Sequence, residues 1–321
     1  MPVTEISIPL LVIAGPTATG KTALAVALAG QLNGEVVSAD SMLVYRGMDI
    51  GTAKPSMAER RGIPHHLIDV VDPDQDYNVA LYQRQARDCI EDIHRRGKLP
   101  LLAGGTGLYI RAVIDHFTFT PAGVDPAFRR QMQELAVREG PSAVHRLLAA
   151  VDAGAAVRIH PNNLKRVIRA LEVHHLTGRS MSAFRDRNEG KNDYRPVMFG
   201  LAMERAALYR RVEARVEEML GAGLIEEVKG LLNRGYGPQL PAMQGLGYKE
   251  IAAFLRGECS REEAVELLKK NTRRFAKRQY TWFRADKRIT WLDVEAYSGP
   301  AAMAQEINQR LAGVWPGASK K

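Results

Sequence analysis

A glycine-rich segment near the start of the chain has the residue types and spacing of a phosphate-binding loop. The segment Gly15-Pro-Thr-Ala-Thr-Gly-Lys-Thr22 matches the pattern GxxxxGK[ST] and lies between an apolar run and a stretch rich in Ala and Leu. Glycines let the backbone curl so that successive N–H groups enclose phosphate oxygens, and the following helix adds the positive end of its dipole. The residues expected to bind phosphate are Gly15, Pro16, Thr17, Ala18, Thr19, Gly20, Lys21 and Thr22.

Two side chains of this loop have separate expected roles. The Lys21 ammonium should reach the terminal phosphate, and the Thr22 hydroxyl should bind Mg²⁺. The backbone N–H groups of residues 16–21 should complete the anion site. The loop does not identify the polyphosphate. The motif occurs most often in nucleotide kinases and NTPases.

Two more polar side chains are expected at the same edge of the predicted sheet. Asp40 follows the predicted strand 35–38, and Thr106 lies in Gly104-Gly-Thr-Gly-Leu-Tyr109, directly after the predicted strand 101–103. Ligands of doubly wound sheets bind at the carboxyl ends of the strands. The sequence therefore predicts a carboxylate and a hydroxyl beside the phosphate loop.

The order of the segments predicts an α/β fold. Short apolar runs alternate with helical stretches and glycine turns, which is typical of a P-loop NTPase-like parallel sheet flanked by helices. The predicted strands are residues 10–14, 35–38, 65–70, 101–103, 196–201 and 288–294, and helices are predicted at 21–32 and 80–96. Residues 125–185 indicate helices without strands between them. We therefore predict a core of residues 1–117 and 194–321 and a helical insertion domain of residues 118–193.

The formal net charge of +9 is concentrated in one segment. Residues 1–100 hold ten Lys and Arg against twelve Asp and Glu, whereas residues 261–290 hold ten against four. A contact with a polyanion and a merely solvated helix face explain such a segment equally well. Two rows at helical spacing predict one broad basic face with Phe275 turned inward; they are Lys269, Arg273 and Lys277, and Lys270, Arg274 and Arg278. A second basic cluster comprises Lys165, Arg166 and Arg169.

Composition excludes several classes of protein. No apolar run reaches the ~18–20 residues that a membrane helix needs. Cys89 and Cys259 lie far apart without a CxxC pattern, which excludes a disulfide framework and a cysteine-based zinc site. With no signal-peptide pattern at the N-terminus, we expect a cytoplasmic protein. The adjacent pairs His65-His66 and His174-His175 are expected to be structural, since neighbours in regular structure cannot both face one metal.

Six segments in this order resemble the tRNA dimethylallyltransferase family. They are the phosphate loop, SADS…DIGTAKP at 38–55, GGTGLY at 104–109, RVIRALEV at 166–173, GLGYKE at 245–250 and AKRQYTWFR at 276–284. The resemblance, which runs from about residue 8 to 295, implies transfer of a dimethylallyl group from its diphosphate to N6 of adenosine 37 in tRNA. The tRNAs would be those that read codons beginning with U, and the products N6-isopentenyladenosine and diphosphate. It also implies Mg²⁺ as cofactor, and we expect a monomer.

The resemblance assigns roles at the reacting centre. Asp40 would be the general base that takes the proton of the attacking amine. The alternative is that Asp40 only holds Mg²⁺ through water or caps a helix. The groups that would stabilise the leaving diphosphate are Lys21, Thr22, Thr106 and Arg215.

The resemblance also indicates which residues border the tRNA. From residue type alone, Trp282 and Phe283 belong more often to a core than to a base-stacking site. The implied set is Asp40, Ser41, Met42, Leu43, Thr106, Arg129, Lys165, Arg166, Val167, Ile168, Arg169, Gln244, Gly245, Leu246, Gly247, Tyr248, Lys249, Lys277, Arg278, Gln279, Tyr280, Thr281, Trp282, Phe283 and Arg284.

Three other functions remain open. An adenylate isopentenyltransferase performs the same chemistry on a free nucleotide and would need neither the basic segment nor the helical insertion. A small-molecule kinase would use the phosphate loop alone. A non-catalytic RNA-binding protein would not need Asp40.

Overall fold

The central element of the fold is a parallel sheet. The structure is a computed structural model of the chain, and it describes residues 7–115, 117, 119, 123–185 and 193–315. Within this described part the sheet has six strands in the order β3-β2-β4-β1-β5-β6. They are β1 (Ile8–Ala14), β2 (Gly34–Ser38), β3 (His65–His66), β4 (Leu99–Gly104), β5 (Tyr194–Ala202) and β6 (Ile289–Asp293). All neighbouring strands run parallel.

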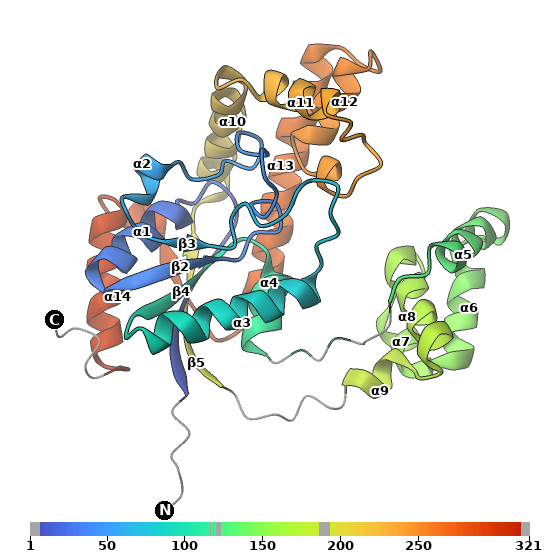
Figure 1. Cartoon of the computed structure of the whole chain (residues 1–321), viewed down its shortest axis with the longest axis horizontal. Coiled ribbons are helices and arrows are strands. Elements are labelled where there is room, and N and C mark those ends of the chain that lie inside the picture. Colours follow the sequence, from blue (N-terminus) through green and yellow to red (C-terminus); the bar gives the residue numbers. More distant parts are fainter. Residues whose placement is uncertain (1–6, 116, 118, 120–122, 186–192, 316–321) are drawn as a thin grey trace, which may run out of the picture. The chain divides into compact units, whose positions relative to one another are not determined.

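Helices cover both faces of this sheet (Figure 1). On one face, Leu11 and Ile13 of β1 pack against α1 (Lys21–Gln31) and α14 (Pro300–Ala312). On the other face, Leu10 and Val12 pack against α3 (Val79–Arg95) and α4 (Gly107–Ile114). Because β1 is buried on both faces, its sequence is continuously apolar instead of alternating.

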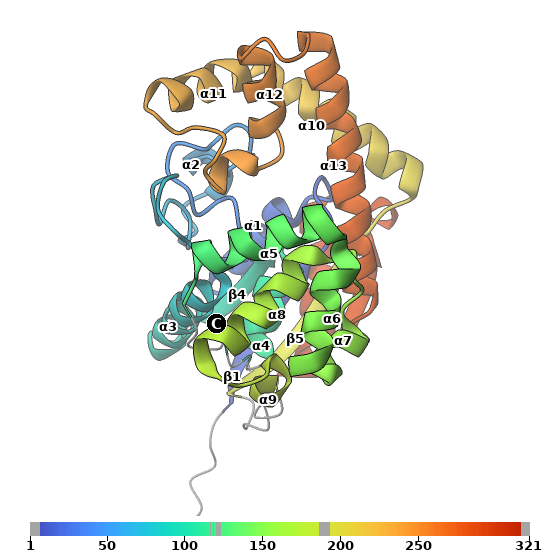
Figure 2. The same cartoon turned by 90° about the vertical axis from the view of Figure 1, so that its right-hand side faces the viewer.

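A group of helices stands at the carboxyl ends of the strands (Figure 2). It comprises α10 (Arg205–Gly221), α11 (Leu224–Asn233), the 3₁₀ turn η1 (Ala242–Gln244), α12 (Tyr248–Leu255) and the long α13 (Arg261–Arg284). The group shares a core with the segment after β2, in which Val44 and Met48 pack with Leu224 and Leu268. This segment continues into the short α2 (Met57–Arg60). The group of helices and the segment after β2 therefore pack together at the carboxyl ends of the strands.

The residues between α4 and β5 form a second compact unit. The chain divides into Met1–Ile114 with Asn192–Lys321, and Asp115–Lys191. The second unit holds α5 (Pro126–Glu139), α6 (Pro141–Val151), α7 (Ala153–Arg158), α8 (Leu164–Thr177) and α9 (Met181–Arg185). Val144 and Leu171 lie in its own apolar core. The Asp125 side chain starts α5 by accepting hydrogen bonds from the N–H groups of Ala127 and Phe128.

The third predicted strand is wrong over most of its length. Only His65 and His66 pair with β2, and Leu67 and Asp69 have positive φ angles that no strand contains. The chain leaves the sheet there because Asp69 and Val70 donate backbone hydrogen bonds to Leu43 and Val44. The α/β fold and its parallel sheet are confirmed.

Candidate functional site

The phosphate loop joins β1 to α1 in a conformation that its small residues permit. Gly15 has φ 146° and no room for a side chain, since an added Cβ would lie 3.0 Å from the Leu201 carbonyl oxygen. Ala18 (φ 65°) and Gly20 (φ 86°) are also left-handed. The buried Thr19 hydroxyl donates to the Pro16 carbonyl oxygen at 2.8 Å and fixes the curl.

Not every N–H group of the loop is free to bind phosphate. Pro16 has no N–H, and the Thr17 N–H donates to Gln279 Oε1 at 2.8 Å. The expectation that the N–H groups of residues 16–21 all serve the anion is therefore wrong for these two. The N–H groups from Ala18 onward remain available for an anion.

Lys21 and Arg215 place two cations at one site. Lys21 Nζ donates to the Pro16 carbonyl oxygen at 2.7 Å. Burial, and next the charge of Arg215, lower the pKa of Lys21 to about 7, while Asp40 opposes this shift. Burial also lowers the pKa of Arg215, again opposed by Asp40. Arg215, from α10, is thus brought within electrostatic range of Lys21, and its contact with a diphosphate stays a prediction.

Asp40 and Thr106 meet at the carboxyl ends of β2 and β4. Asp40 Oδ1 accepts the Met42 N–H at 2.8 Å, and Thr106 Oγ1 accepts the Ser41 N–H at 3.1 Å. The Thr106 N–H donates to the Ala39 carbonyl oxygen at 3.0 Å. Asp40 lies within electrostatic range of Lys21 and Arg215, and Thr106 contacts the residue that follows Asp40.

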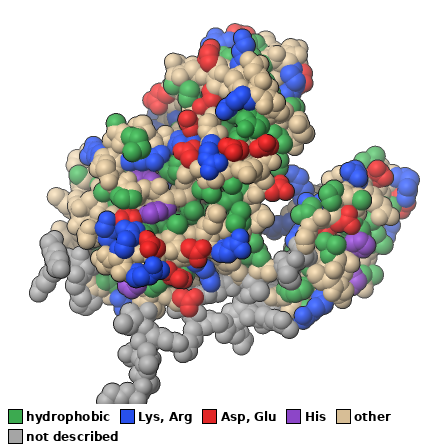
Figure 3. All heavy atoms as spheres, in the orientation of Figure 1, with side chains coloured by type: hydrophobic (Ala, Val, Ile, Leu, Met, Phe, Trp, Pro, Cys, Tyr) green, Lys and Arg blue, Asp and Glu red, His purple; other side chains and the backbone are tan. Residues whose placement is uncertain are grey.

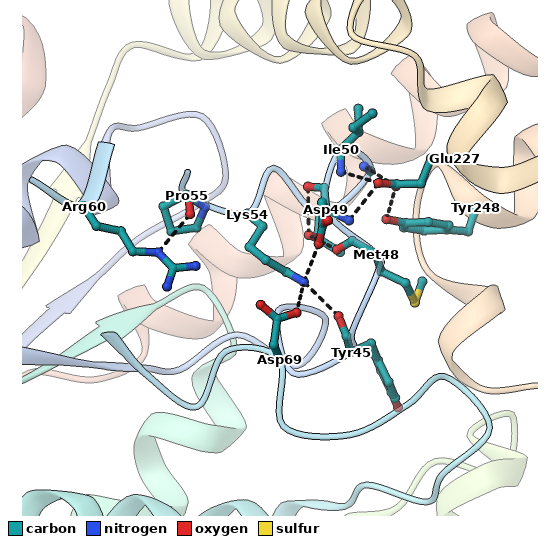
Figure 4. A network of polar contacts seen from close by, with 12 residues as sticks. Tyr45, Met48, Asp49, Ile50, Lys54, Pro55, Arg60, Asp69, Glu227 and Tyr248 are labelled. Atoms are coloured by element: carbon teal, nitrogen blue, oxygen red, sulfur yellow. Dashed lines mark hydrogen bonds and ion pairs between the residues drawn. The ribbon is translucent and has the colours of Figure 1, made fainter. Parts of the chain in front are cut away.

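Glu227 is an important residue that sequence analysis missed. Its carboxylate accepts the N–H groups of Asp49, Ile50 and Gly51 at 2.8–3.1 Å, and the Tyr248 hydroxyl at 2.7 Å (Figure 4). The segment DIGTAKP is thereby attached to α11 and α12. Glu227 belongs to no recognisable motif, and only the row of backbone donors across from it explains its position.

Lys54 holds the other side of the same segment. Its side chain is 5% exposed, and Nζ donates to the Tyr45 carbonyl oxygen at 2.9 Å and to Asp49 Oδ1 at 2.6 Å, with an additional ion pair to Asp69 (Figure 4). The lysine of DIGTAKP is therefore structural. It shapes the segment that leads from Asp40 to α2.

The basic face of α13 is narrower than predicted. Lys269 pairs with Glu217 at 2.7 Å and Arg273 pairs with Glu213, both acids of α10. Those two cations therefore face another helix, and their prediction as part of the open face is wrong. Four exposed cations remain, Lys270, Arg274, Lys277 and Arg278. Phe275, predicted to turn inward, is half-buried and lies under the Arg278 guanidinium, 5.7 Å from it.

A cavity opens beside this face. Its volume is about 670 Å³. It combines cations with the indole of Trp282, which is 36% exposed. Such a lining suits a negatively charged chain with flat rings. The lining residues are Arg111, Arg274, Lys277, Arg278, Thr281, Trp282 and Ala285.

Five residues expected to border tRNA have buried side chains. They are Val167, Ile168, Tyr248, Gln279 and Phe283, each at most 6% exposed. These side chains pack inside the protein, and that their positions border the tRNA stays a prediction. Phe283 lies in the core as its residue type suggested, whereas Trp282 does not. Tyr280 is half-buried, and its hydroxyl is hydrogen-bonded to the backbone of Met203.

Two predicted RNA-contacting arginines of the second unit are ion-paired. Arg129 makes two 2.8 Å hydrogen bonds to the carboxylate of Glu172, and Arg169 also pairs with it. Burial alone would raise the pKa of Glu172, but the two arginines outweigh it and lower that pKa to about 2. Lys165 and Arg166 remain exposed.

The other expected RNA neighbours lie after β2, around the start of α12 and at the end of α13. Met42 packs on Gly245, where an added Cβ would overlap its terminal methyl group. Leu43, Leu246 and Lys249 are half-buried. The exposed members are Gln244, Thr281 and Arg284. Gly247 begins α12 with φ 90°.

The residues present fit Mg²⁺ only in company with a phosphate ligand. Thr22 is exposed in the first turn of α1, and Mg²⁺ commonly takes one or two protein oxygens plus phosphate oxygens and water. Across the described ranges, no group of three or more His, Cys, Asp or Glu could hold a metal by itself. The histidine pairs have other partners, since His66 Nε2 lies 2.8 Å from Glu35 and His175 stacks on Phe128.

The fold and site define a parallel α/β protein in which a glycine-rich loop and its lysine lie near the carboxylate of Asp40. The sequence profile of the IPP transferase family matches residues 43–286, and that of isopentenyl transferase matches residues 8–70. The chain belongs to the IPP transferase family. The predictions that it resembles bacterial tRNA dimethylallyltransferases and is a prenyltransferase enzyme are confirmed.

Known relatives cover nearly the whole chain. A tRNA dimethylallyltransferase of Pelotomaculum thermopropionicum is 56% identical over 95% of this chain and 97% of its own. One of Desulforudis audaxviator is 58% identical over 93% and 96%. The tRNA isopentenylpyrophosphate transferase structure from Bacillus halodurans is 45% identical, with a TM-score of 0.73 over 97% and 98% of the chains. A eukaryotic dimethylallyltransferase acting on tRNA is 30% identical, with a TM-score of 0.80 over 96% and 80%.

No helix in the described ranges is both long and apolar enough to cross a membrane. The space-filling view of the larger unit shows Lys and Arg side chains mixed with Asp and Glu on the face turned to the viewer (Figure 3). The local basic surface of α13 is therefore a better guide to a polyanion partner than the net charge.

Proposed function

We propose that this protein transfers a dimethylallyl group from dimethylallyl diphosphate to N6 of adenosine 37 in tRNAs that read codons beginning with U. The observation that carries this proposal is the meeting of Lys21, Arg215 and Asp40 at one sheet edge. Two cations suit a diphosphate, and a carboxylate among them suits removal of a proton next to it. The names of the relatives support tRNA as the acceptor. The protein acts as a monomer in the cytoplasm.

The reaction is a displacement at the allylic carbon. A bond forms between adenine N6 and C1 of the dimethylallyl group, and the bond between C1 and the diphosphate oxygen breaks. Asp40 takes an N6 proton, so the nitrogen stays neutral instead of gaining a positive charge as its bond to C1 forms. The electron pair of the broken bond leaves with diphosphate.

The departing diphosphate gains negative charge, which fixed donors can stabilise. Lys21, Arg215 and the backbone N–H groups of residues 18–22 are the donors at this edge, with Thr106 beside them. Thr22 would hold Mg²⁺, whose charge would add to this stabilisation when it is bound. The phosphate loop is in this proposal a leaving-group site, and no phosphoryl group moves.

The tRNA has to present an unpaired, unstacked adenine, which is how proteins generally treat single RNA bases. Exposed cations on α13 and in the second unit are the proposed phosphate contacts. Trp282, beside those of α13, offers a stacking surface. The cations are Lys270, Arg274, Lys277, Arg278, Lys165 and Arg166.

The deciding experiment is transfer of radiolabelled dimethylallyl from its diphosphate to unmodified tRNA, with free AMP and ATP tested as acceptors in parallel. Label at A37 of tRNA alone supports the proposal. Label in a free nucleotide indicates an adenylate isopentenyltransferase instead. No transfer, together with ATP turnover on a small metabolite, indicates a kinase.

A further inference from the structure

Gln279 connects the phosphate loop to a second loop through its side-chain amide. Its Oε1 accepts the Thr17 N–H at 2.8 Å, and its Nε2 donates to the Gly105 carbonyl oxygen at 3.0 Å. The side chain is 6% exposed. An added Cβ on Gly105 would overlap Nε2, so the amide is closely enclosed. Both ends of the amide are therefore used, and each serves a different loop of the proposed reaction site.

The same helical turns carry the basic surface outward. Lys277 and Arg278 precede Gln279, Thr281 and Trp282 follow it, and all four line the 670 Å³ cavity. Trp282 also packs directly over Gly107, the first residue of α4. One rigid stretch of α13 thus contacts the loops on one side and presents cations on the other.

Helix α13 also sets the position of α10. Glu213 and Glu217, which lie one turn apart on α10, pair with Arg273 and Lys269. Arg215 lies between them in sequence and takes part in the electrostatics of Lys21. Helix α13 therefore contacts both the helix that carries Arg215 and, through Gln279, the backbone of Thr17. These contacts link α13, which carries the cationic surface, to the phosphate loop with Lys21 and to the helix with Arg215.

We propose that Gln279 is a positioning residue that couples occupancy of the basic α13 surface by RNA to binding of diphosphate at the phosphate loop. This inference rests on the proposed function. RNA bound on the basic surface of α13 holds Gln279 in place, and Gln279 in turn holds Thr17 and Gly105 in the arrangement that suits the anion. The coupling is reciprocal, so diphosphate also tightens RNA binding.

The test measures binding without turnover. We would determine the Kd of inorganic diphosphate with Mg²⁺, in the absence and presence of saturating unmodified tRNA. For the unaltered protein we expect tRNA to tighten diphosphate binding by about fivefold or more, the lower range of typical couplings. Gln279→Met keeps the length and volume but removes both hydrogen bonds. For this variant we expect the ratio of the diphosphate Kd without tRNA to the Kd with tRNA to lie within about twofold of one. The Kd for tRNA alone should stay within about threefold of that of the unaltered protein.

Three controls make the outcome specific. Gln309→Met makes the same change at an exposed position of α14 and should leave the ratio unchanged. Gln279→Glu keeps an acceptor for Thr17 but loses the donor to Gly105, so it should retain part of the coupling and serves if the methionine variant does not fold. A thermal melt measures the stability of each variant. A loss of coupling without a lower melting temperature is therefore assigned to the missing hydrogen bonds.

A ratio near one in the unaltered protein, or a full ratio in Gln279→Met, overturns the coupling role. Failure of the proposed function has a different signature. In that case no dimethylallyl is transferred to tRNA by the unaltered protein, whatever the binding ratio.

Discussion

The Tyr248 hydroxyl donates a 2.7 Å hydrogen bond to Glu227, whose carboxylate also accepts three successive backbone N–H groups. The Tyr248 ring packs so closely on Gly51 that an added Cβ would lie 2.6 Å from it. The Glu227 side chain thus fixes the position of residues 49–51 relative to α11 and α12. Because this segment continues from Asp40, its anchor belongs to the supports of the proposed reaction site.

Replacing Glu227 should destabilise the core. Glu227→Ala leaves the N–H groups of Asp49, Ile50 and Gly51 and the Tyr248 hydroxyl without their acceptor. Unsatisfied buried donors cost about 1–3 kcal/mol each when water cannot replace the partner, and this site is partly open. We expect a loss of about 2–4 kcal/mol in the free energy of unfolding, measured by urea denaturation. Glu226→Ala, an exposed neighbour, should change it by less than about 0.5 kcal/mol. Equal effects of the two variants would contradict the anchor.

Lys21 should make diphosphate binding dependent on pH. Its pKa of about 7 in the free protein means that the side chain becomes neutral as pH rises through 7. A bound anion favours the ammonium and raises that pKa, so binding at pH 8 takes up a proton and weakens as pH rises further. Calorimetry at pH 8 in two buffers of different ionisation enthalpy should show an uptake approaching one proton.

Lys21→Arg provides the matched control, because arginine stays charged throughout this range. Its titration reports any protons contributed by diphosphate itself. The uptake assigned to Lys21 is the difference between the two proteins. An identical uptake in both would show that the Lys21 ammonium persists at pH 8 in the free protein.

Much of the fold could be predicted from sequence because buried parallel strands are continuously apolar. That signal located β1, β4 and β5, and shorter apolar stretches indicated β2 and β6. It failed at residues 67–70, three of which are apolar. The conformation of this segment depends on residues far away in the sequence, such as Lys54, which forms an ion pair with Asp69. The composition of the segment itself cannot predict such an ion pair. The edge position of β3 left little pairing to hold a longer strand.

The site was less predictable where helices face one another. Spacing by four correctly grouped the cations of α13 but could not reveal that acids of α10 lie against two of them. Gln279 illustrates the same limit. A polar residue in a basic segment suggests an RNA contact, whereas the structure buries its amide between two loops.

Asp40→Asn should separate binding from chemistry. The amide matches the carboxylate in size but cannot take the N6 proton. We expect the rate of dimethylallyl transfer in single turnovers to fall at least about 100-fold, the lower range for a lost general base. The Kd for tRNA should stay within about threefold. A nearly normal rate would remove Asp40 from proton transfer and favour its alternative role near the metal.

Charge reversal on α13 should change the salt dependence of tRNA binding. Arg274→Glu with Arg278→Glu removes two exposed cations that line the cavity. Each phosphate contact releases counterions on binding, so each lost contact lowers the slope of log K against log salt by about 0.7–0.9. We expect the double variant to bind tRNA more weakly and its slope to be shallower by about 1.5, measured between about 50 and 200 mM salt.

Lys229→Glu is the matched control, because it reverses one exposed charge on α11 outside the cavity. It changes net charge without removing a proposed contact, so its slope should stay close to that of the unaltered protein. Since local phosphate contacts set the slope, an unchanged slope in this variant shows that reversing an exposed charge outside the cavity does not by itself lower it. A double variant with an unaltered slope would mean that this surface of α13 is only solvated.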